Sequence, residues 1–181
     1  MRKALLLLLG GCLSLAGIAQ QRIPINVSYY APYLIQPGLK VSTDIYLTEM
    51  GQAEETSKLL FVSPQVGYFS QPNTSRNLLF QADMGIRFKK AERARYISPS
   101  VGLAYVRSTQ ILSNEVNLGS LESTPQTKIK SFFLPTLNLK MGREGTGRLG
   151  QYVNLFLGHQ FSTEATNASF FGLELGLSFY L

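Results

Sequence analysis

The C-terminal segment 171–181 alternates strictly between large apolar residues and smaller or polar ones. The odd positions from Phe171 to Leu181 are all apolar, and the even positions are Gly172, Glu174, Gly176, Ser178 and Tyr180. A period of two is typical of a β-strand with one apolar and one polar face. Ten residue steps of strand span about 33 Å, and a tilt of roughly 40° leaves a rise of about 25 Å, the height of the apolar band of a membrane barrel. The segment is therefore long enough to cross a bilayer as a strand.

The same alternation recurs along the chain after residue 22. The expected strands are 23–30, 39–48, 58–69, 78–88, 96–107, 128–141, 151–161 and 171–181. In the fourth of them, Leu78 and Phe80 point one way while Asp83 and Arg87 point the other. Pro64 cannot donate to a β-ladder, so we expect an edge or a bulge in the third. The pattern predicts an all-β fold, an eight-stranded antiparallel up-and-down transmembrane β-barrel.

The N-terminus carries the features of a secretory signal peptide. A positively charged start is followed by a mostly apolar run to Ile18, and Gly17 and Ala19 supply the small residues that signal peptidase favours. A membrane-spanning helix would need about 20 apolar residues, more than this run supplies. We therefore expect a cleaved signal peptide at 1–19 and a single mature domain at 20–181.

The single cysteine lies within this N-terminal segment. Because Cys12 follows Leu9-Gly10-Gly11, a lipobox with a lipidated Cys12 is an alternative, although an apolar stretch follows where lipoproteins usually have a polar tether. With a cleaved signal peptide, the mature chain has no cysteine and a single histidine, His159. Thiolate and multi-histidine metal sites are thereby excluded, and we expect no cofactor.

Composition agrees with a chain whose apolar residues are interleaved with polar ones. Hydrophobic residues make up 45% of the sequence, yet its mean hydropathy is only +0.05. Without Arg2 and Lys3, 15 basic residues stand against 11 acidic ones. This surplus is mild and is not clustered as a nucleic-acid-binding surface requires, so we expect no nucleic-acid partner.

The last strand also carries a recognisable motif. Glu174, Gly176, Phe179 and Leu181 resemble the C-terminal β-signal that the barrel assembly machinery reads, with Leu181 in place of the usual terminal aromatic residue. Together with the signal peptide and the eight alternating segments, the motif makes the chain similar to the OmpA/OmpX-like outer-membrane β-barrel family. The resemblance implies a place in the cell outer membrane, contact with its lipid, and insertion by the assembly machinery through the last strand. It implies no particular activity, because the fold hosts many functions.

An even strand number places both termini of the barrel chain on one side of the membrane, which we take as the periplasmic side. The connections 31–37, 70–76, 108–127 and 162–168 are then extracellular, and 49–57, 89–95 and 142–150 are periplasmic. The longest, 108–127, falls on the outer side, where such barrels carry long loops, and we expect an extracellular partner site there. Aromatic residues cluster near the expected strand ends and predict girdles at the lipid headgroups, with Tyr30, Phe69 and Tyr96 among them.

The predicted register points six charged side chains into the barrel. Three are basic and three acidic: Lys40, Arg87, Lys140, Asp44, Asp83 and Glu174. Buried charges persist when they are paired, and an eight-stranded barrel is just wide enough for side chains to fill. We therefore expect a lumen plugged by a polar network, with a narrow pore or ligand pocket as the alternative.

A catalytic alternative rests on the single histidine. His159 and Ser162, with Glu164 or Glu174, resemble the Ser-His-Glu set of outer-membrane lipid A deacylases. Those enzymes hold His and Ser two residues apart on one face, whereas the spacing here is three, which sends the side chains to opposite faces of a regular strand. We therefore expect no catalytic residues and no enzyme activity.

The stretch 87–95, R-F-K-K-A-E-R-A-R, is strongly basic. It could hold lipid phosphates or a peripheral partner, but a solvated periplasmic turn is the simpler interpretation. For the whole chain, the sequence predicts a barrel with a structural or surface-interaction role. The alternative from another class is a secreted, soluble lipocalin-like carrier, whose barrel would be apolar inside and polar outside.

Overall fold

The computed structural model describes residues 23–34, 36–53, 56–71, 74–90, 94–111, 127–145, 147–160 and 168–180. These residues form β1 (Pro24–Pro32), β2 (Gly38–Thr43), β3 (Ile45–Ala53), β4 (Thr56–Gln71), β5 (Ser75–Lys90), β6 (Arg95–Ile111), β7 (Thr127–Arg143), β8 (Leu149–Gln160) and β9 (Ala168–Tyr180). No helix in this part of the chain is long and apolar enough to span a bilayer. The expected signal peptide at 1–19, with Cys12, lies outside the described residues.

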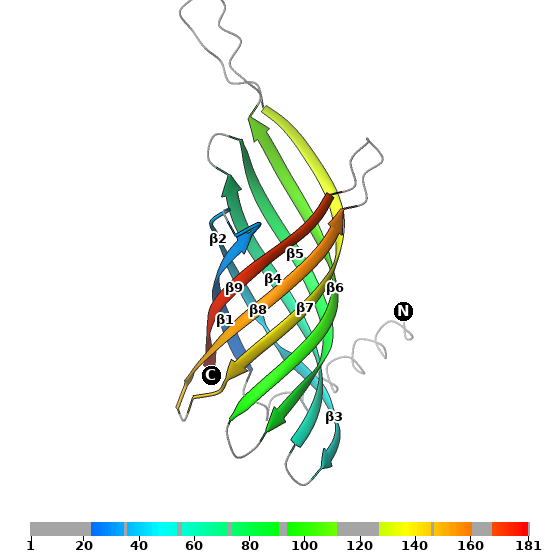
Figure 1. Ribbon diagram of the computed structural model, residues 1–181, viewed down its shortest axis with the longest axis vertical. Helices are drawn as coiled ribbons and strands as arrows, with labels where there is room; N and C mark the ends of the chain where they lie inside the picture. The colour runs from blue at the N-terminus through cyan, green and yellow to red at the C-terminus, as the bar shows by residue number, and fades with distance from the viewer. Residues whose placement is uncertain are drawn as a thin grey trace, which may run out of the picture.

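The strands pair antiparallel in chain order, and the sheet closes on itself (Figure 1). β1 pairs with β9 from Pro24 opposite Tyr180 to Pro32 opposite Gly172, and with β2 on its other side. Both ends of the described chain therefore lie at one end of the barrel, here called the terminal end; the opposite end is called the loop end. The predicted antiparallel barrel is confirmed.

β2 and β3 together make up one of the eight predicted strands. Both pair with β4, and their register is continuous: Ser42 lies opposite Gln65 and Ile45 opposite Val62. The ladder is interrupted between these two pairs, where β4 contributes Pro64. Because proline has no backbone N–H to donate, the interruption at Pro64 follows from the sequence. Further along β3, the register against β4 shifts twice, which marks β-bulges.

The strands extend further than the alternation predicts, so the three turns at the terminal end are shorter than expected. β3 and β4 are separated only by residues 54–55, β5 continues to Lys90, and β7 continues to Arg143. Polar and charged residues at these strand ends hide the apolar pattern, although their backbone still pairs. At the loop end, β6 and β7 include 108–111 and 127 of the predicted loop 108–127, and 112–126 lie outside the described residues.

Apolar side chains cover the outside of the barrel. Leu39 is 65% exposed and Phe133 and Leu157 are each 59% exposed, and they belong to a set of large exposed hydrophobic residues on every strand. The inward positions of the same strands carry charged, polar and aromatic residues. This distribution is the reverse of a soluble barrel and is that of a lipid-facing wall.

The half of the interior nearer the loop end holds an apolar cluster, with the buried polar residues Asn77 and Ser108 beyond it. The buried residues of this cluster are Tyr30, Phe69, Leu79, Ala104, Val106, Leu134 and Phe156. The Tyr30 ring stacks on Phe156, with centroids 4.7 Å apart, and meets the edge of Phe69 at 5.6 Å. Tyr30, Phe69 and Tyr96 are at most 4% exposed and face the interior, so the prediction that these three belong to lipid-facing girdles is wrong. They occupy inward positions of the period-two pattern, which proximity to a strand end does not reveal.

Candidate functional site

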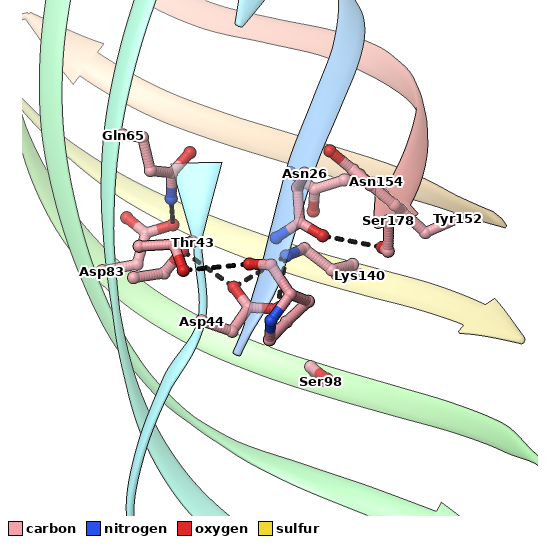
Figure 2. A network of polar contacts seen from close by, with 12 residues as sticks. Asn26, Thr43, Asp44, Gln65, Asp83, Ser98, Lys140, Tyr152, Asn154 and Ser178 are labelled. Atoms are coloured by element: carbon pink, nitrogen blue, oxygen red, sulfur yellow. Dashed lines mark hydrogen bonds and ion pairs between the residues drawn. The ribbon is translucent and has the colours of Figure 1, made fainter. Parts of the chain in front are cut away.

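The six charged residues expected inside the barrel all lie there. None of Lys40, Asp44, Asp83, Arg87, Lys140 and Glu174 is more than 8% exposed. They come from β2, the β2–β3 junction, β5, β7 and β9, so the network spans much of the barrel wall. Figure 2 shows Asp44, Asp83 and Lys140 among the polar side chains that meet inside.

Asp44 is the centre of the largest charged group. Its Oδ2 atom lies 2.5 Å from Nη2 of Arg87, and the Nζ atom of Lys140 lies 3.1 Å from Oδ1 and 3.2 Å from Oδ2. Ser63 donates its hydroxyl hydrogen to Oδ1 at 2.9 Å. One carboxylate thus serves two cations, and all of these groups are buried.

Arg87 lies in an aromatic enclosure towards the terminal end. Its Nε donates to Ser98 Oγ at 3.1 Å, and its Nη1 donates to the Tyr46 hydroxyl. The guanidinium carbon lies 4.1 Å from the centroid of the Tyr96 ring and 5.7 Å from that of Phe61. Cation–π contacts of this kind stabilise a cation that has left water.

Lys40 and Glu174 form a second charged group where the first and last strands meet. Lys40 Nζ lies 2.5 Å from Glu174 Oε2. The carboxylate also accepts hydrogen bonds from Ser28 Oγ at 2.7 Å, the Tyr152 hydroxyl at 2.9 Å and Asn154 Nδ2 at 3.0 Å. These contacts use most of the acceptor capacity of Glu174.

Asp83 departs from the expected pairing of three bases with three acids. Its carboxylate accepts hydrogen bonds from the side-chain amides of Gln65 at 2.5 Å, Gln81 at 2.7 Å and Asn138 at 3.1 Å. Among the described residues, no lysine or arginine forms a salt bridge with it, whereas Asp44 has two. Register alone predicts the face of a side chain but not its height in the barrel, so amide partners could not be foreseen.

Glycines provide the room for the large interior side chains. Gly176 lies directly opposite Tyr152, Gly172 opposite Phe156, and Gly142 opposite Tyr96. A Cβ atom added to Gly176 or Gly172 would overlap the facing aromatic ring. The inward faces of β7 and β9 therefore combine small and large residues across neighbouring strands, as a filled small barrel requires.

Replacing Gly176 with alanine is expected to destabilise the barrel by about 1 to 3 kcal/mol, the usual cost of overpacking. The added methyl group would displace Tyr152, which is buried and donates to Glu174. Urea-induced unfolding in lipid vesicles measures the change. Gly147→Ala is the control, because nothing lies within 4 Å of a Cβ there. Equal stability of the two variants would contradict the tight interior packing.

The residues of the proposed β-signal are divided between the two faces of β9. Glu174 lies inside, Gly176 faces Tyr152, and Phe179 is 42% exposed on the outside, opposite Ile25 of β1. Leu181 lies outside the described residues. Recognition of this segment by an assembly machinery stays a prediction.

The histidine of the catalytic alternative lies at the loop end of β8. His159 is opposite Ser169 of β9, and its Nδ1 lies 3.3 Å from the Ser169 hydroxyl. Ser162 and Glu164 lie outside the described residues. His159 shares the outward face with the exposed residues Leu155 and Leu157, while Glu174 points inward to Lys40. Glu174 therefore cannot orient this imidazole.

Comparisons with known proteins reveal similarity at the level of structure only. No protein-family model and no curated protein sequence matches the chain. The N-terminal β-barrel domain of OprF from Pseudomonas aeruginosa superposes with a TM-score of 0.61 at 14% identity, over 90% of this chain and 98% of that domain. A major outer membrane protein from Thermus thermophilus gives 0.58 at 10% identity, over 88% and 99% of the two chains.

The outer membrane enzyme PagL superposes with a TM-score of 0.53 at 12% identity, over 87% of this chain and 99% of that chain. At such identities the likeness concerns the fold and carries no activity across. The three structures share a barrel of nearly the same extent as this one. The chain therefore has the fold of the small, OmpA/OmpX-like outer-membrane β-barrels.

Proposed function

We propose that the protein is an integral outer-membrane β-barrel with a structural or surface-interaction role, a lumen closed by its own side chains, and no catalytic activity. The observation that carries this proposal is the hydrogen-bonded interior around Asp44, Arg87 and Lys140, in which charged groups occupy the space that a channel would need. An eight-stranded barrel has an interior just wide enough for such side chains.

The membrane location is supported by the contrast between the two faces of every strand. The outside carries large apolar residues over the length of the barrel, and a soluble protein rarely exposes so much contiguous apolar surface. A lipocalin-like carrier would need the opposite arrangement, with an apolar interior to hold its ligand. Here Glu174, Arg87 and Asp44 are among the most deeply buried side chains, which disfavours that alternative.

Three successive interior layers support a closed lumen. The apolar cluster around Tyr30 and Phe156 lies in the half of the barrel nearer the loop end. The charged groups of Glu174 and Asp44 follow, and Arg87 with its aromatic neighbours lies towards the terminal end. An ion crossing the barrel would have to displace all three layers, two of which are held by salt bridges.

The proposed absence of catalysis rests on the separation of the candidate groups. Inside the barrel, Glu174 forms a salt bridge with Lys40 and accepts a hydrogen bond from Tyr152, whereas His159 lies on the outward face near Ser169. A nucleophile, a base and a group that orients the base must share one site. The described part of the chain does not unite His159 and Glu174 in this way.

A surface role is supported by the position of the longest connection. β6 and β7 are each 17 residues long and remain paired as far as Ile111 opposite Thr127 (Figure 1). These two strand ends, which the connection 112–126 joins, lie at the end of the barrel opposite to Pro24 and Tyr180. In the orientation proposed here, the connection faces the outside of the cell, where a partner would meet it.

Purified protein in planar bilayers is expected to give no discrete conductance steps, even at high protein load. Phe156→Ala, which opens the apolar interior layer, and Phe133→Ala, which shortens a lipid-facing residue, form a matched pair of variants. If steps occur at all, we expect them only for the Phe156 variant. Reproducible steps from the unmodified protein would replace the closed lumen with a pore.

A further inference from the structure

Three cations form a row on the outward face of the barrel at the terminal end. Lys90 of β5 lies directly opposite Arg95 of β6, and Arg95 lies opposite Arg143 of β7. All three side chains are exposed. The structure thus divides the basic stretch 87–95: Arg87 points inward and Lys89 is paired with Glu144, whereas Lys90 and Arg95 point outward.

Like charges at directly opposed positions of an antiparallel sheet are destabilising. Among the described residues, no carboxylate forms a salt bridge with Arg95 or Arg143. The two arginines lie side by side on neighbouring strands, which brings two guanidinium groups within reach of one ligand. An anion bound between them would turn their mutual repulsion into a common attraction.

A groove of about 840 Å³ begins at this arginine pair and continues over the apolar wall. Its lining includes Arg95 and Arg143 at one end and Met141, Val153, Leu175 and Leu177 beyond them. Met141 lies opposite Val153, and Val153 opposite Leu175, so these side chains form a continuous apolar strip across β7, β8 and β9. A ligand that fits this groove has an anionic group at one end and a hydrocarbon chain at the other.

We propose that the groove binds an anionic glycerophospholipid, with the phosphate at Arg95 and Arg143 and an acyl chain along the strip from Met141 to Leu175. Guanidinium groups match phosphate oxygens in a bidentate geometry, and apolar side chains match the acyl chain. The proposal rests on the membrane location and orientation given above. In that orientation, the arginines lie at the periplasmic surface, and the strip rises from them towards the middle of the bilayer.

The experiment measures which lipids stay with the protein. Full-length protein is reconstituted into nanodiscs of phosphatidylcholine with a small fraction of phosphatidylglycerol, released into mild detergent, and examined by native mass spectrometry. The test variant is Arg95→Gln with Arg143→Gln. The control variant is Arg76→Gln with Arg107→Gln, which removes two exposed arginines from the loop end, one of them on the same strand β6.

The unmodified protein should retain phosphatidylglycerol in preference to phosphatidylcholine. An arginine near an anionic lipid surface contributes about 1 kcal/mol, or roughly a fivefold factor, so the test variant should lose the preference by roughly five- to twenty-five-fold. The control variant should keep it. Both variants should still enter nanodiscs and shift on gels when heated, because the substituted side chains are exposed.

Retention that is unaffected by the Arg95 and Arg143 substitutions would overturn the proposal, as would a preference that follows Arg76 and Arg107. In a further test, lipopolysaccharide is added to the unmodified protein and to the Arg95 and Arg143 variant. Displacement of phosphatidylglycerol from the unmodified protein alone would also overturn the proposal, because the groove would then bind lipopolysaccharide. Protein that fails to enter nanodiscs at all would instead refute the membrane location itself. The two proposals therefore fail in distinguishable ways.

Discussion

Replacing Asp44 with asparagine should lower the free energy of unfolding by roughly 3 to 5 kcal/mol, the cost of leaving a buried charge without its partner. Arg87 and Lys140 both lie within salt-bridge distance of this carboxylate, and both are buried. Asparagine keeps the shape of the side chain but removes the charge that both cations require. Urea titration of the protein in lipid vesicles, followed by tyrosine fluorescence and gel mobility, measures the loss.

The same substitution at Asp83 is the matched control. Its partners are neutral amides from Gln65, Gln81 and Asn138, so Asp83→Asn leaves no cation without a salt-bridge partner. The substitution should cost at most about 2 kcal/mol in lost hydrogen bonds. Both residues are buried carboxylates in the same barrel, which removes differences of depth and size. A loss at Asp83 equal to or greater than that at Asp44 would show that the salt bridges of Asp44 do not stabilise the interior.

Replacing Leu175 with arginine should reduce stability in membranes by roughly 2 to 4 kcal/mol, as expected for a basic residue at the bilayer midplane. Leu175 is 49% exposed on the outside of β9, between Tyr29 of β1 and Val153 of β8. It lies near the middle of its strand, where a guanidinium group is far from both headgroup regions. The heat-modifiable fraction of the protein in membranes reports on assembly.

Leu175→Ala should assemble nearly as well as the unmodified protein, because alanine adds no polar group to the lipid-facing wall. Ser169→Arg should cost no more than about 1 kcal/mol, since it lies on the same face of β9 but at the loop end. Depth in the bilayer is then the main difference between the two arginine variants. Equal tolerance of arginine and alanine at position 175 would mean that this residue does not face lipid.

The alternation of apolar and polar residues was sufficient to predict the barrel. Successive side chains of a strand point to opposite faces, so a barrel wall with lipid outside and a polar interior requires a period of two. The alternation failed at strand ends such as Lys90 and Arg143, where charged residues continue to pair after the apolar pattern has stopped. It also left open how Pro64 would be accommodated, since the interruption depends on which residues of β2 and β3 lie opposite.

The sequence predicts which side chains point into the barrel, but it does not predict which of them are in contact with one another. The inward direction of Lys40 and Glu174 follows from parity, but their contact depends on how far β2 and β9 are displaced along the barrel axis. That displacement is set by the closure of the whole sheet, so no local pattern records it. The cationic row of Lys90, Arg95 and Arg143 was hidden for the same reason, because its members come from three strands.

The contact between β1 and β9 favours one register of these two strands over shifted registers when the barrel closes. Ser28 on β1, Lys40 on β2 and Glu174 on β9 meet only when the first and last strands pair in the observed register. A slip of one residue would turn Glu174 towards the hydrocarbon and Leu175 towards the charged interior. A one-residue shift of β9 therefore carries two energetic costs, one from Glu174 in the hydrocarbon and one from Leu175 in the charged interior. These costs make closure in a shifted register less stable than closure in the observed one.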